Sequence, residues 1–528
     1  MTSYATIHEL LSYQVAERPG RPCLIYEDRQ WSYAEFAAEV ERVARAFAAL
    51  GLRPGQRVAI LLPNCSEFLC AVFAMARTGG VFVPLNTAQT ADELQYLLSH
   101  SEARCLLTAD AFMPLIQGIR GDCPKLEQVI TLDPPGGSGV LDWDEFIRGA
   151  ERRPALTEVS PEDMASIIYT SGTTDRPKGV MLKHSAFAFA PSHRARALGW
   201  TGDDRVLVVM PLFHVNALCH MTLAMMSVGG GVVLKDRFSA SRFWDDVKRH
   251  GVTTSSIMQT IPRILLNLPP DPADADTPLR QAMALLPPDV HLEFERRFGV
   301  TAVPTYSLTE DLLSVLGPLD VSRRKLGSCG VPIAPEVHRV RIVNEEGENC
   351  APGEFGEIVK QSPAVMMGYY KNPDATAAAL RDGWLHTGDL GYLDEDGFLY
   401  FVDRKKDIIK RGGENIASAE VERVLNSHPL VAESAAVAVP DIIRQEEVKA
   451  CIVLAANASP EDLPPERLWE FCAEHLAAFK IPRYLDYRPE LPKTPSSKVQ
   501  KNLLRGEGVG PEVADRIALT NFTGAAKR

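Results

Sequence analysis

The chain has 528 residues, of which 45% are hydrophobic and 23% charged. This composition is typical of a globular protein and excludes a disordered chain. At about 100–200 residues per domain, the length predicts three or four structural units, or one large domain with a small one. The 56 Lys and Arg against 68 Asp and Glu give a net charge of −12, which argues against sequence-independent nucleic-acid binding.

Cysteine usage and hydropathy bear on the cellular location. The ten cysteines are scattered singly without a C-x-x-C pair, which predicts reduced, mostly buried thiols in a cytoplasmic protein. The N-terminus lacks a basic region followed by an apolar one, so we expect no signal peptide. Residues 206–234 carry no formal charge, but Pro211, His214 and a triple glycine interrupt them. We therefore predict a strand, a loop, a helix and a Gly turn there rather than a membrane span.

The first 260 residues alternate short apolar runs with longer helical patterns. A helix is predicted over residues 66–80, closed by glycine. This alternation predicts a parallel sheet with helices on both faces. The predicted strands are residues 57–63, 81–86, 103–110, 125–133, 205–212, 230–236 and 253–260.

The pattern changes after about residue 330. Apolar and polar residues alternate over residues 338–362, and Gly, Asn and Glu turns interrupt them, which predicts antiparallel strands. Residues 391–404 predict a hairpin. A smaller unit begins beyond Arg404, and its tail after about Arg505 is weakly patterned. In this unit we predict helices over residues 418–428 and 466–480 and strands over residues 431–441 and 448–456.

The most informative run extends from Tyr169 to Val180 and follows an apolar strand. It holds four Ser and Thr hydroxyls, two glycines and Lys178, which together can surround phosphate oxygens with donors and a fixed positive charge. The ordinary alternative is a surface Ser/Thr/Gly turn. Because the spacing is not that of a Walker A loop, the run predicts a different kind of phosphate site.

This run resembles the signature of the AMP-forming adenylating enzymes, which include acyl-CoA synthetases, luciferases and adenylation domains. Four further motifs follow in the order of that family, and together they cover roughly residues 25–505. They are Tyr306–Glu310, Gly383–Gly391, Asp403–Asp407 with Gly412–Ile416, and Pro492–Lys498.

The resemblance implies a fold, a reaction and partners. The fold is α/β, with a large N-terminal domain of packed mixed and parallel sheets plus a small β-barrel-like subdomain, and a small mobile α+β C-terminal domain. The expected divisions are residues 1–404, a hinge at 405–406 and residues 407–528. A carboxylic acid attacks the α-phosphate of ATP with Mg²⁺, pyrophosphate leaves, and CoA then displaces AMP. We expect a monomer or homodimer without nucleic acid or a membrane span.

The resemblance also assigns the nucleotide site. Glu310, with Thr170, matches the magnesium ligands, and Thr309 should reach the α-phosphate. Tyr306 should cover the adenine, Asp389 should bind the ribose hydroxyls, and Arg404 should hold ribose or phosphate. Without the resemblance, Glu310 would be an ordinary loop carboxylate and Tyr306 a core aromatic. Asp389 would be a turn residue and Arg404 an exposed cation. The nucleotide-binding positions are Thr170, Ser171, Gly172, Thr173, Thr174, Lys178, Tyr306, Asp389 and Arg404.

The remaining matches concern catalysis, the acceptor and the acid. Lys498 matches the lysine that stabilises the adenylation step, Lys406 matches the hinge, and Gly412 with Gly413 matches the loop that lines the CoA tunnel. His214 matches an aromatic or His gate of the family and counts as catalytic here, although alone it would be an ordinary core histidine. The predicted walls of the acid pocket are His214, Val215, Asn216, Cys219, Met258, Thr260, Met283, Ser307 and Leu308.

The sequence departs from the family pattern at several uncharged positions and at Asp175. Ser307 and Ser497 replace glycines, Gln445 replaces a frequent glycine, and residues 282–285 replace a loop beside the acid. These changes predict an active enzyme with an unusual, small or medium aromatic or polar acid. The alternatives are another acceptor (a carrier-protein thiol, an amine, or nitrite adenylated to diazotise an aromatic amine) and a nucleotide-binding regulator without catalysis.

Overall fold

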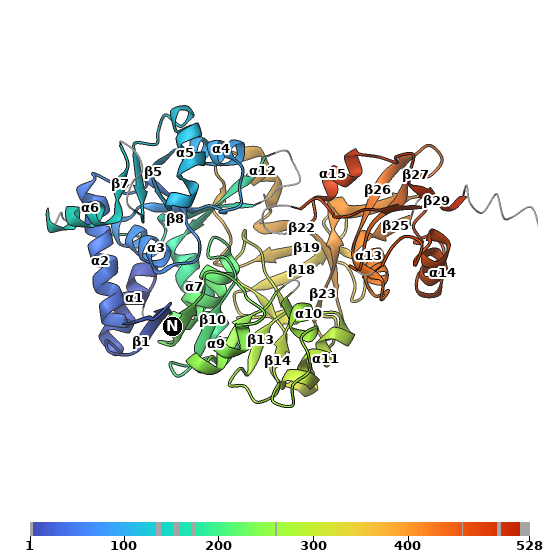
Figure 1. Cartoon of the computed structure of the whole chain (residues 1–528), viewed down its shortest axis with the longest axis horizontal. Coiled ribbons are helices and arrows are strands. Elements are labelled where there is room, and N and C mark those ends of the chain that lie inside the picture. The colour runs from blue at the N-terminus through green and yellow to red at the C-terminus, as the bar shows by residue number, and fades with distance from the viewer. Residues whose placement is uncertain are drawn as a thin grey trace, which may run out of the picture. The chain divides into compact units, whose positions relative to one another are not determined.

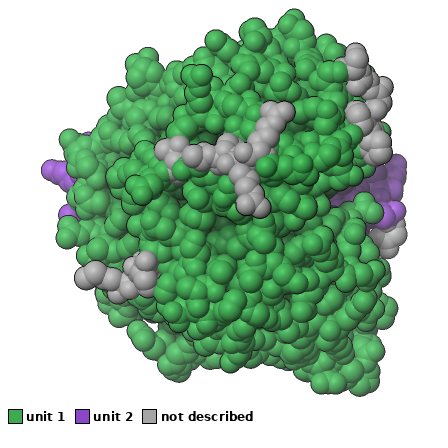
Figure 2. All heavy atoms as spheres, turned by 90° about the vertical axis from the view of Figure 1, so that its left-hand side faces the viewer, with its two compact units in different colours: residues 1–341, 359–387, 393–400 green, residues 342–358, 388–392, 401–528 purple. Residues whose placement is uncertain are grey.

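The computed structural model divides the chain into two compact units. Unit 1 contains residues 1–341, 359–387 and 393–400, and unit 2 contains residues 342–358, 388–392 and 401–528 (Figure 2). The structure describes residues 4–133, 139–152, 156, 158–170, 176–258, 261–412, 414–456, 458–493 and 498–517.

The first large sheet of unit 1 has eight strands. Figure 1 labels three of its strands, β5, β7 and β8. The central pairs β3/β4, β3/β5, β4/β8 and β5/β6 are parallel, as predicted, and β8/β9 and β20/β9 are antiparallel. The central strands are buried on both faces, which explains their continuous apolar sequences. In spatial order the strands are β20 (Gly368–Tyr369), β9 (Lys178–Lys183), β8 (Met164–Thr170), β4 (Val81–Pro84), β3 (Arg57–Leu61), β5 (Ala103–Thr108), β6 (Gln128–Thr131) and β7 (Leu141–Asp142).

The second large sheet of unit 1 has seven strands, all in parallel pairs except for the antiparallel pair β1/β2. The predicted strands at 205–212, 230–236 and 253–260 are present but shorter. In spatial order the strands are β14 (Thr301–Val303), β13 (Gln281–Met283), β12 (Thr254–Ser256), β10 (Arg205–Val208), β11 (Gly231–Leu234), β1 (Pro22–Tyr26) and β2 (Arg29–Ser32).

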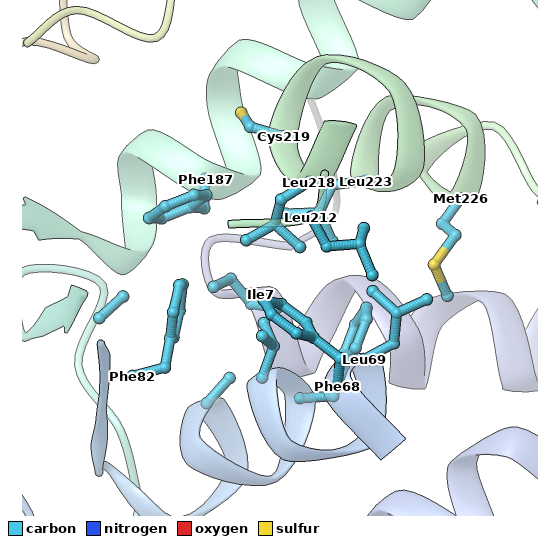
Figure 3. Close-up of a cluster of buried hydrophobic side chains, with 14 of the residues drawn as sticks. Ile7, Phe68, Leu69, Phe82, Phe187, Leu212, Leu218, Cys219, Leu223 and Met226 are labelled. Carbon is cyan, nitrogen blue, oxygen red and sulfur yellow. The ribbon is translucent and has the colours of Figure 1, made fainter. Parts of the chain in front are cut away.

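Helices pack against both sheets and bury a common core. In Figure 3, Phe82 of β4 and Phe187 of α7 lie close to one another, with ring centroids 5.6 Å apart. Burying each large apolar side chain of this kind contributes about 1.5–3 kcal/mol. The helices of unit 1 are α1 (Ile7–Glu17), α2 (Tyr33–Ala49), α3 (Ser66–Thr78), α4 (Ala91–Ser101), α5 (Met113–Ile119), α6 (Trp143–Arg148), α7 (His184–Ala197), α8 (Ala224–Ser227), α9 (Phe243–His250), α10 (Ile261–Leu266), α11 (Pro288–Phe298) and α12 (Pro373–Ala379).

The helix boundaries follow local sequence signals. Ser32 caps α2 with Glu35, and Thr90 caps α4 with Glu93, each as a reciprocal capping box. The predicted helix after residue 66 ends at Gly79, whose φ of 71° lies in the left-handed region that favours glycine. The uncharged stretch 206–234 forms β10, a loop, the π-helix η4 (Asn216–Leu223), α8 and β11. Its strand–loop–helix–turn order is confirmed, although the π-helix was not predicted.

Two smaller sheets follow the large ones. One is the antiparallel sheet β15 (Thr305–Tyr306), β16 (Val315–Leu316) and β17 (Val331–Pro332). The other is the predicted half-barrel sheet, with strand order β18-β19-β22-β21 and β23 paired to β22. Its strands are β18 (Arg339–Val343), β19 (Gly356–Gln361), β21 (Leu380–Arg381), β22 (Trp384–Leu393) and β23 (Leu399–Arg404), and β22 with β23 forms the predicted hairpin.

Unit 2 contains a six-stranded sheet with its own helices and hydrophobic core. The predicted helix over 466–480 is wrong at its C-terminal end, because α14 ends at His475 and Leu476 is extended. The backbone of Leu476 has φ −125° and ψ 146°, so the helix does not continue past it, and the chain then leads into β28. The elements are β24 (Ile408–Arg411), β25 (Glu414–Ala417), β26 (Val431–Asp441), β27 (Gln445–Leu454), β28 (Tyr484–Tyr487), β29 (Ala514–Asp515), α13 (Ser418–Asn426), α14 (Pro465–His475) and α15 (Lys501–Gly506).

The predicted fold class is confirmed by this mixed α/β architecture. The predicted boundaries at 404 and 406 stay predictions. Nine of the ten cysteines are buried, and Cys350 is half-buried. Among the residues that the structure describes, no helix combines the length and hydropathy needed to cross a membrane.

Candidate active site

Lys178 is held at the end of the predicted phosphate run by a β-hairpin. Strands β8 and β9 pair antiparallel, and Thr170 lies opposite Lys178. Tyr96 donates a hydrogen bond to the Pro177 carbonyl over 3.3 Å and also lies under the Arg176 guanidinium. The side chain of Lys178 is half-buried. Four predicted phosphate-loop residues lie outside the described ranges: Ser171, Gly172, Thr173 and Thr174.

Tyr369 joins Lys178 to the predicted magnesium ligand. Its hydroxyl donates to Glu310 Oε1 over 2.9 Å, and Lys178 Nζ lies 5.1 Å from the centre of its ring. Strand β20 carries Tyr369 and pairs with β9, while the Met366 N–H donates to the Glu310 carbonyl over 2.8 Å. Residues far apart in sequence are therefore brought together within unit 1. The sequence prediction missed Tyr369, although the aromatic pair after Gly368 was a visible signal.

The carboxylate next to Glu310 has a different environment. Asp311 is fully buried, lies 2.8 Å from Lys360 Nζ and accepts hydrogen bonds from Ser362 Oγ and the Leu313 N–H. Burial alone would raise the pKa of Asp311, but Lys360, His338 and these hydrogen bonds hold it below its ordinary value. Asp311 is therefore committed to a buried ion pair, which leaves Glu310 as the available carboxylate of this segment.

The donor set fits a magnesium ion that is shared with phosphate. Glu310 is half-buried, and the Tyr369 hydrogen bond goes to one of its two oxygens. Mg²⁺ is commonly held by one or two carboxylates together with substrate phosphates rather than by a full protein cage. Within the described part of the chain, no three His, Cys, Asp or Glu side chains are grouped to hold a metal on their own. This arrangement suits an ion that arrives with a nucleotide.

Most of the predicted acid and adenine positions lie in two segments of unit 1, residues 214–223 and 305–310. Tyr306 on β15 is buried, whereas Ser307, Leu308 and Thr309 after it are half-buried. His214 packs its ring against Phe213, with centroids 4.4 Å apart, directly before η4. π-Helical turns are rare and often occur at functional sites.

The predicted pocket walls differ in burial. Cys219 (Figure 3) and Met283 are fully buried in the large core cluster. Val215 is buried and Met258 half-buried, and Asn216 Oδ1 is buried without a hydrogen-bond partner in the described part of the chain. Thr260 lies outside the described residues. The wall assignments stay predictions.

Asp389 and Arg404 meet within unit 2. Arg404 Nε lies 2.8 Å from Asp389 Oδ1, and Asp389 is almost fully buried. Glu357 accepts a hydrogen bond from the Gly388 N–H over 3.1 Å and lies 3.4 Å from Lys405 Nζ. The neighbouring Glu357, which the sequence prediction missed, therefore holds the backbone before Asp389. This pair supplies a carboxylate and a guanidinium at one place, as a ribose and phosphate site requires.

The predicted hinge and lysine motif also lie in unit 2. Lys406 is exposed in a single 3₁₀ turn between β23 and β24, and its carbonyl accepts a hydrogen bond from Arg505 over 3.3 Å. Gly412 has a φ of 60° and donates to the Arg444 carbonyl, whereas Gly413 lies outside the described residues. Lys498 is exposed. Their roles stay predictions.

Family models match two parts of the chain. The model described as AMP-binding enzyme matches residues 11–370, and the AMP-binding enzyme C-terminal domain matches residues 420–498. The chain belongs to the AMP-binding enzyme family. The predicted resemblance is therefore confirmed.

Members of this family resemble the chain over almost its whole length. A crotonobetaine/carnitine–CoA ligase of Salmonella choleraesuis (strain SC-B67) is 35% identical over 501 residues, covering 92% of this chain and 96% of that protein. The anthranilate CoA ligase AuaEII in complex with anthranoyl-AMP has a TM-score of 0.86 at 27% identity, covering 96% of this chain and 98% of that one. O-succinylbenzoate coenzyme A synthetase (MenE) from Bacillus subtilis, in complex with AMP, has a TM-score of 0.80 at 34% identity, covering 94% and 98%.

This family membership establishes the type of reaction. The chain is an AMP-forming acyl-CoA ligase, which activates a carboxylic acid with ATP and transfers the acyl group to CoA. The predicted function and enzyme class are confirmed.

Proposed function

We propose that the Lys178, Tyr369 and Glu310 group of unit 1 binds the triphosphate of ATP for attack by the acid. A carboxylate oxygen of the acid bonds to the α-phosphorus, and the bond from phosphorus to the bridging oxygen breaks as pyrophosphate leaves. The CoA sulfur then bonds to the acyl carbon, AMP leaves, and the thiol proton passes to solvent. The observation that supports this assignment is the Tyr369 contact with both charged side chains.

Each side chain of this group has a separate task. Lys178 offsets phosphate charge at a fixed point, since β9 and its hairpin position its backbone. Glu310 would hold Mg²⁺, which neutralises charge on the phosphate oxygens when bound. One of the structural relatives is described in complex with ATP and a magnesium ion, in keeping with this role. Tyr369 is a positioning residue, because its hydroxyl fixes the orientation of the Glu310 carboxylate.

The remaining roles follow from the family and from local geometry. We assign Asp389 and Arg404 to the ribose and phosphate, since their side chains already meet over 2.8 Å. Lys498 stabilises charge during adenylation, and Lys406 is the hinge about which the orientation changes before CoA transfer. The acid enters beside His214. Ten free thiols support a reducing, cytoplasmic location, and the enzyme acts as a monomer or homodimer.

The relatives and the predicted pocket walls bear on the chemical class of the acid. The names of the relatives cover three types of acid: quaternary-ammonium acids, an aromatic amino acid and an aromatic acid with a second carboxylate. The predicted pocket walls mix apolar side chains such as Met283 with polar ones such as Asn216, which supports a small or medium acid rather than a long acyl chain.

ATP–pyrophosphate exchange with a panel of acids tests the proposal directly. Exchange and CoA-dependent AMP release should both require Mg²⁺. Tyr369→Phe keeps the ring next to Lys178 but removes the hydrogen bond to Glu310, so the Mg²⁺ concentration for half-maximal exchange should rise about tenfold. Tyr370→Phe is the matched control, because its hydroxyl donates to Glu102 instead. An unchanged Mg²⁺ requirement in Tyr369→Phe would refute the positioning role.

A further inference from the structure

A fully buried arginine lies on α7, outside the groups assigned above. Arg194 is 1% exposed, and its Nη1 donates to Ser314 Oγ over 2.8 Å and to Thr305 Oγ1 over 3.4 Å. Its Nε and Nη2 atoms are also buried, but they have no hydrogen-bond partner among the residues that the structure describes. These two atoms form one edge of the planar guanidinium, the edge that can bind a carboxylate through two parallel hydrogen bonds.

No carboxylate of the described residues balances this charge, since none forms an ion pair with Arg194. Burial lowers the pKa of Arg194 to about 10, so the guanidinium stays charged near neutral pH. The Cys219 thiol interacts electrostatically with Arg194, and burial raises the pKa of this thiol so that it stays neutral. Because an unpaired charge in the interior costs several kcal/mol, an arginine in this setting suits binding of an anion.

The position of Arg194 associates this edge with the acid. Thr305, which it contacts, directly precedes Tyr306 and Ser307. Cys219 lies on the π-helix that begins just after His214, near enough for its thiol to interact electrostatically with Arg194. On the same π-helix, the buried Asn216 Oδ1 also has no hydrogen-bond partner. Two elements therefore carry unpartnered polar atoms beside the predicted acid pocket.

We propose that Arg194 binds a second anionic group of the substrate, so that the preferred acid is a dicarboxylic acid. The Nε and Nη2 edge holds the far carboxylate while the near carboxylate is adenylated. This inference rests on the proposed function, since it names the substrate class for the same site. A quaternary-ammonium acid places a cation where Arg194 already carries one, so it should be a poor substrate.

The test compares acids that differ only in the far group. The panel consists of malonate, succinate, glutarate and phthalate, the monomethyl ester of each, and crotonobetaine. For at least one pair, the diacid should exceed its ester in kcat/KM for pyrophosphate exchange by about 100-fold, because the ester cannot form the paired charged hydrogen bonds. Crotonobetaine should give less exchange than that diacid.

Variants of α7 distinguish recognition from folding. Arg194→Gln should lower kcat/KM for the preferred diacid by about 100-fold, mainly through KM, and leave the ester unchanged or improved. Arg194→Lys keeps the charge but not the planar guanidinium, so its kcat/KM for the diacid should lie between those of the unmodified enzyme and Arg194→Gln. It replaces the Gln variant in the test if that variant does not fold. Arg196→Gln, an exposed neighbour on the same helix, should change neither substrate.

Calorimetric binding of the same acids separates the two proposals. Diacid binding that depends on Arg194 supports this inference even without exchange, in which case the proposed function fails. Exchange with monoacids, combined with an unchanged diacid-to-ester ratio in both Arg194 variants, would overturn the inference and leave the proposed function intact. A ratio near one in the unmodified enzyme, or no binding of any diacid, would also overturn the inference and would indicate that the Arg194 edge binds only water.

Discussion

The buried pair of Lys360 and Asp311 is expected to stabilise the segment that carries Glu310. Lys360 Nζ lies 2.8 Å from Asp311 Oδ2 and donates to the Leu313 carbonyl over 2.7 Å, with both charged side chains fully buried. Lys360→Met removes the counter-charge and leaves the Asp311 carboxylate with the hydrogen bonds from Ser362 and Leu313. Breaking a buried pair in this way costs about 3–5 kcal/mol of the free energy of unfolding.

A double variant separates the lost ion pair from lost packing. Asp311→Asn combined with Lys360→Met contains no buried charge, and the Asn oxygen still accepts the two hydrogen bonds that Asp311 accepts. The remaining cost is mostly the unpaired Leu313 carbonyl, about 1–3 kcal/mol. We therefore expect the double variant to be more stable than Lys360→Met alone by about 2 kcal/mol.

Urea unfolding followed by circular dichroism measures these differences, and hydrogen exchange at residues 311–313 locates them. Lys360→Met should also raise the Mg²⁺ requirement for pyrophosphate exchange, because Glu310 precedes the disturbed residue. Lys480→Met, which breaks the partly solvated pair with Glu420, is the control and should have a much smaller effect on stability. A loss below about 1 kcal/mol in Lys360→Met, or a double variant no more stable than this single variant, would refute the reasoning.

Three further variants test other parts of the molecule. Lys498→Ala should abolish adenylation but largely spare thioester formation from a supplied acyl-adenylate, and an equal loss in both half-reactions would contradict its role. Lys406→Pro should keep pyrophosphate exchange within a few-fold, while CoA-dependent AMP release falls by orders of magnitude. The same change at Lys405 should have a smaller effect. Normal thioester turnover in Lys406→Pro would place the hinge elsewhere. Burial lowers the pKa of His184 to about 4, so its contribution to stability is complete above about pH 6.5 and is lost as the pH falls toward 4. Between pH 7 and pH 5, His184 should cost the enzyme about 2 kcal/mol of the free energy of unfolding, and urea unfolding should show that His184→Leu lacks this loss. The exposed control His475→Leu should keep it. Equal pH dependence in both variants would refute this assignment.

The sequence alone was sufficient for the fold class, the family and the reaction type. Apolar runs such as residues 57–63 predict strands because a parallel sheet buries both faces, and the Gly at 79 marks a helix end because few other residues adopt its backbone angles. The run around Lys178 predicts a phosphate site from its residue types, and the ordered motifs predict adenylation because they resemble those of the AMP-forming adenylating enzymes. Local signals of this kind depend on neighbours along the chain, so they can be read without a structure. Boundaries were less certain: α14 ends at His475, earlier than its amphipathic pattern predicts, because the chain must turn toward β28.

Only the tertiary structure decided which charged side chains from distant parts of the chain pair with one another. Glu310 and Asp311 are adjacent carboxylates in the sequence, yet one accepts a hydrogen bond from Tyr369 and the other is buried against Lys360. Likewise, nothing in the sequence of α7 indicates that Arg194 is fully buried with one edge of its guanidinium unpartnered. The physical reason is that burial and electrostatic pairing depend on contacts between segments that are far apart along the chain. Residue type and local spacing therefore predict the chemistry, whereas packing between distant segments determines which charged groups remain available for it.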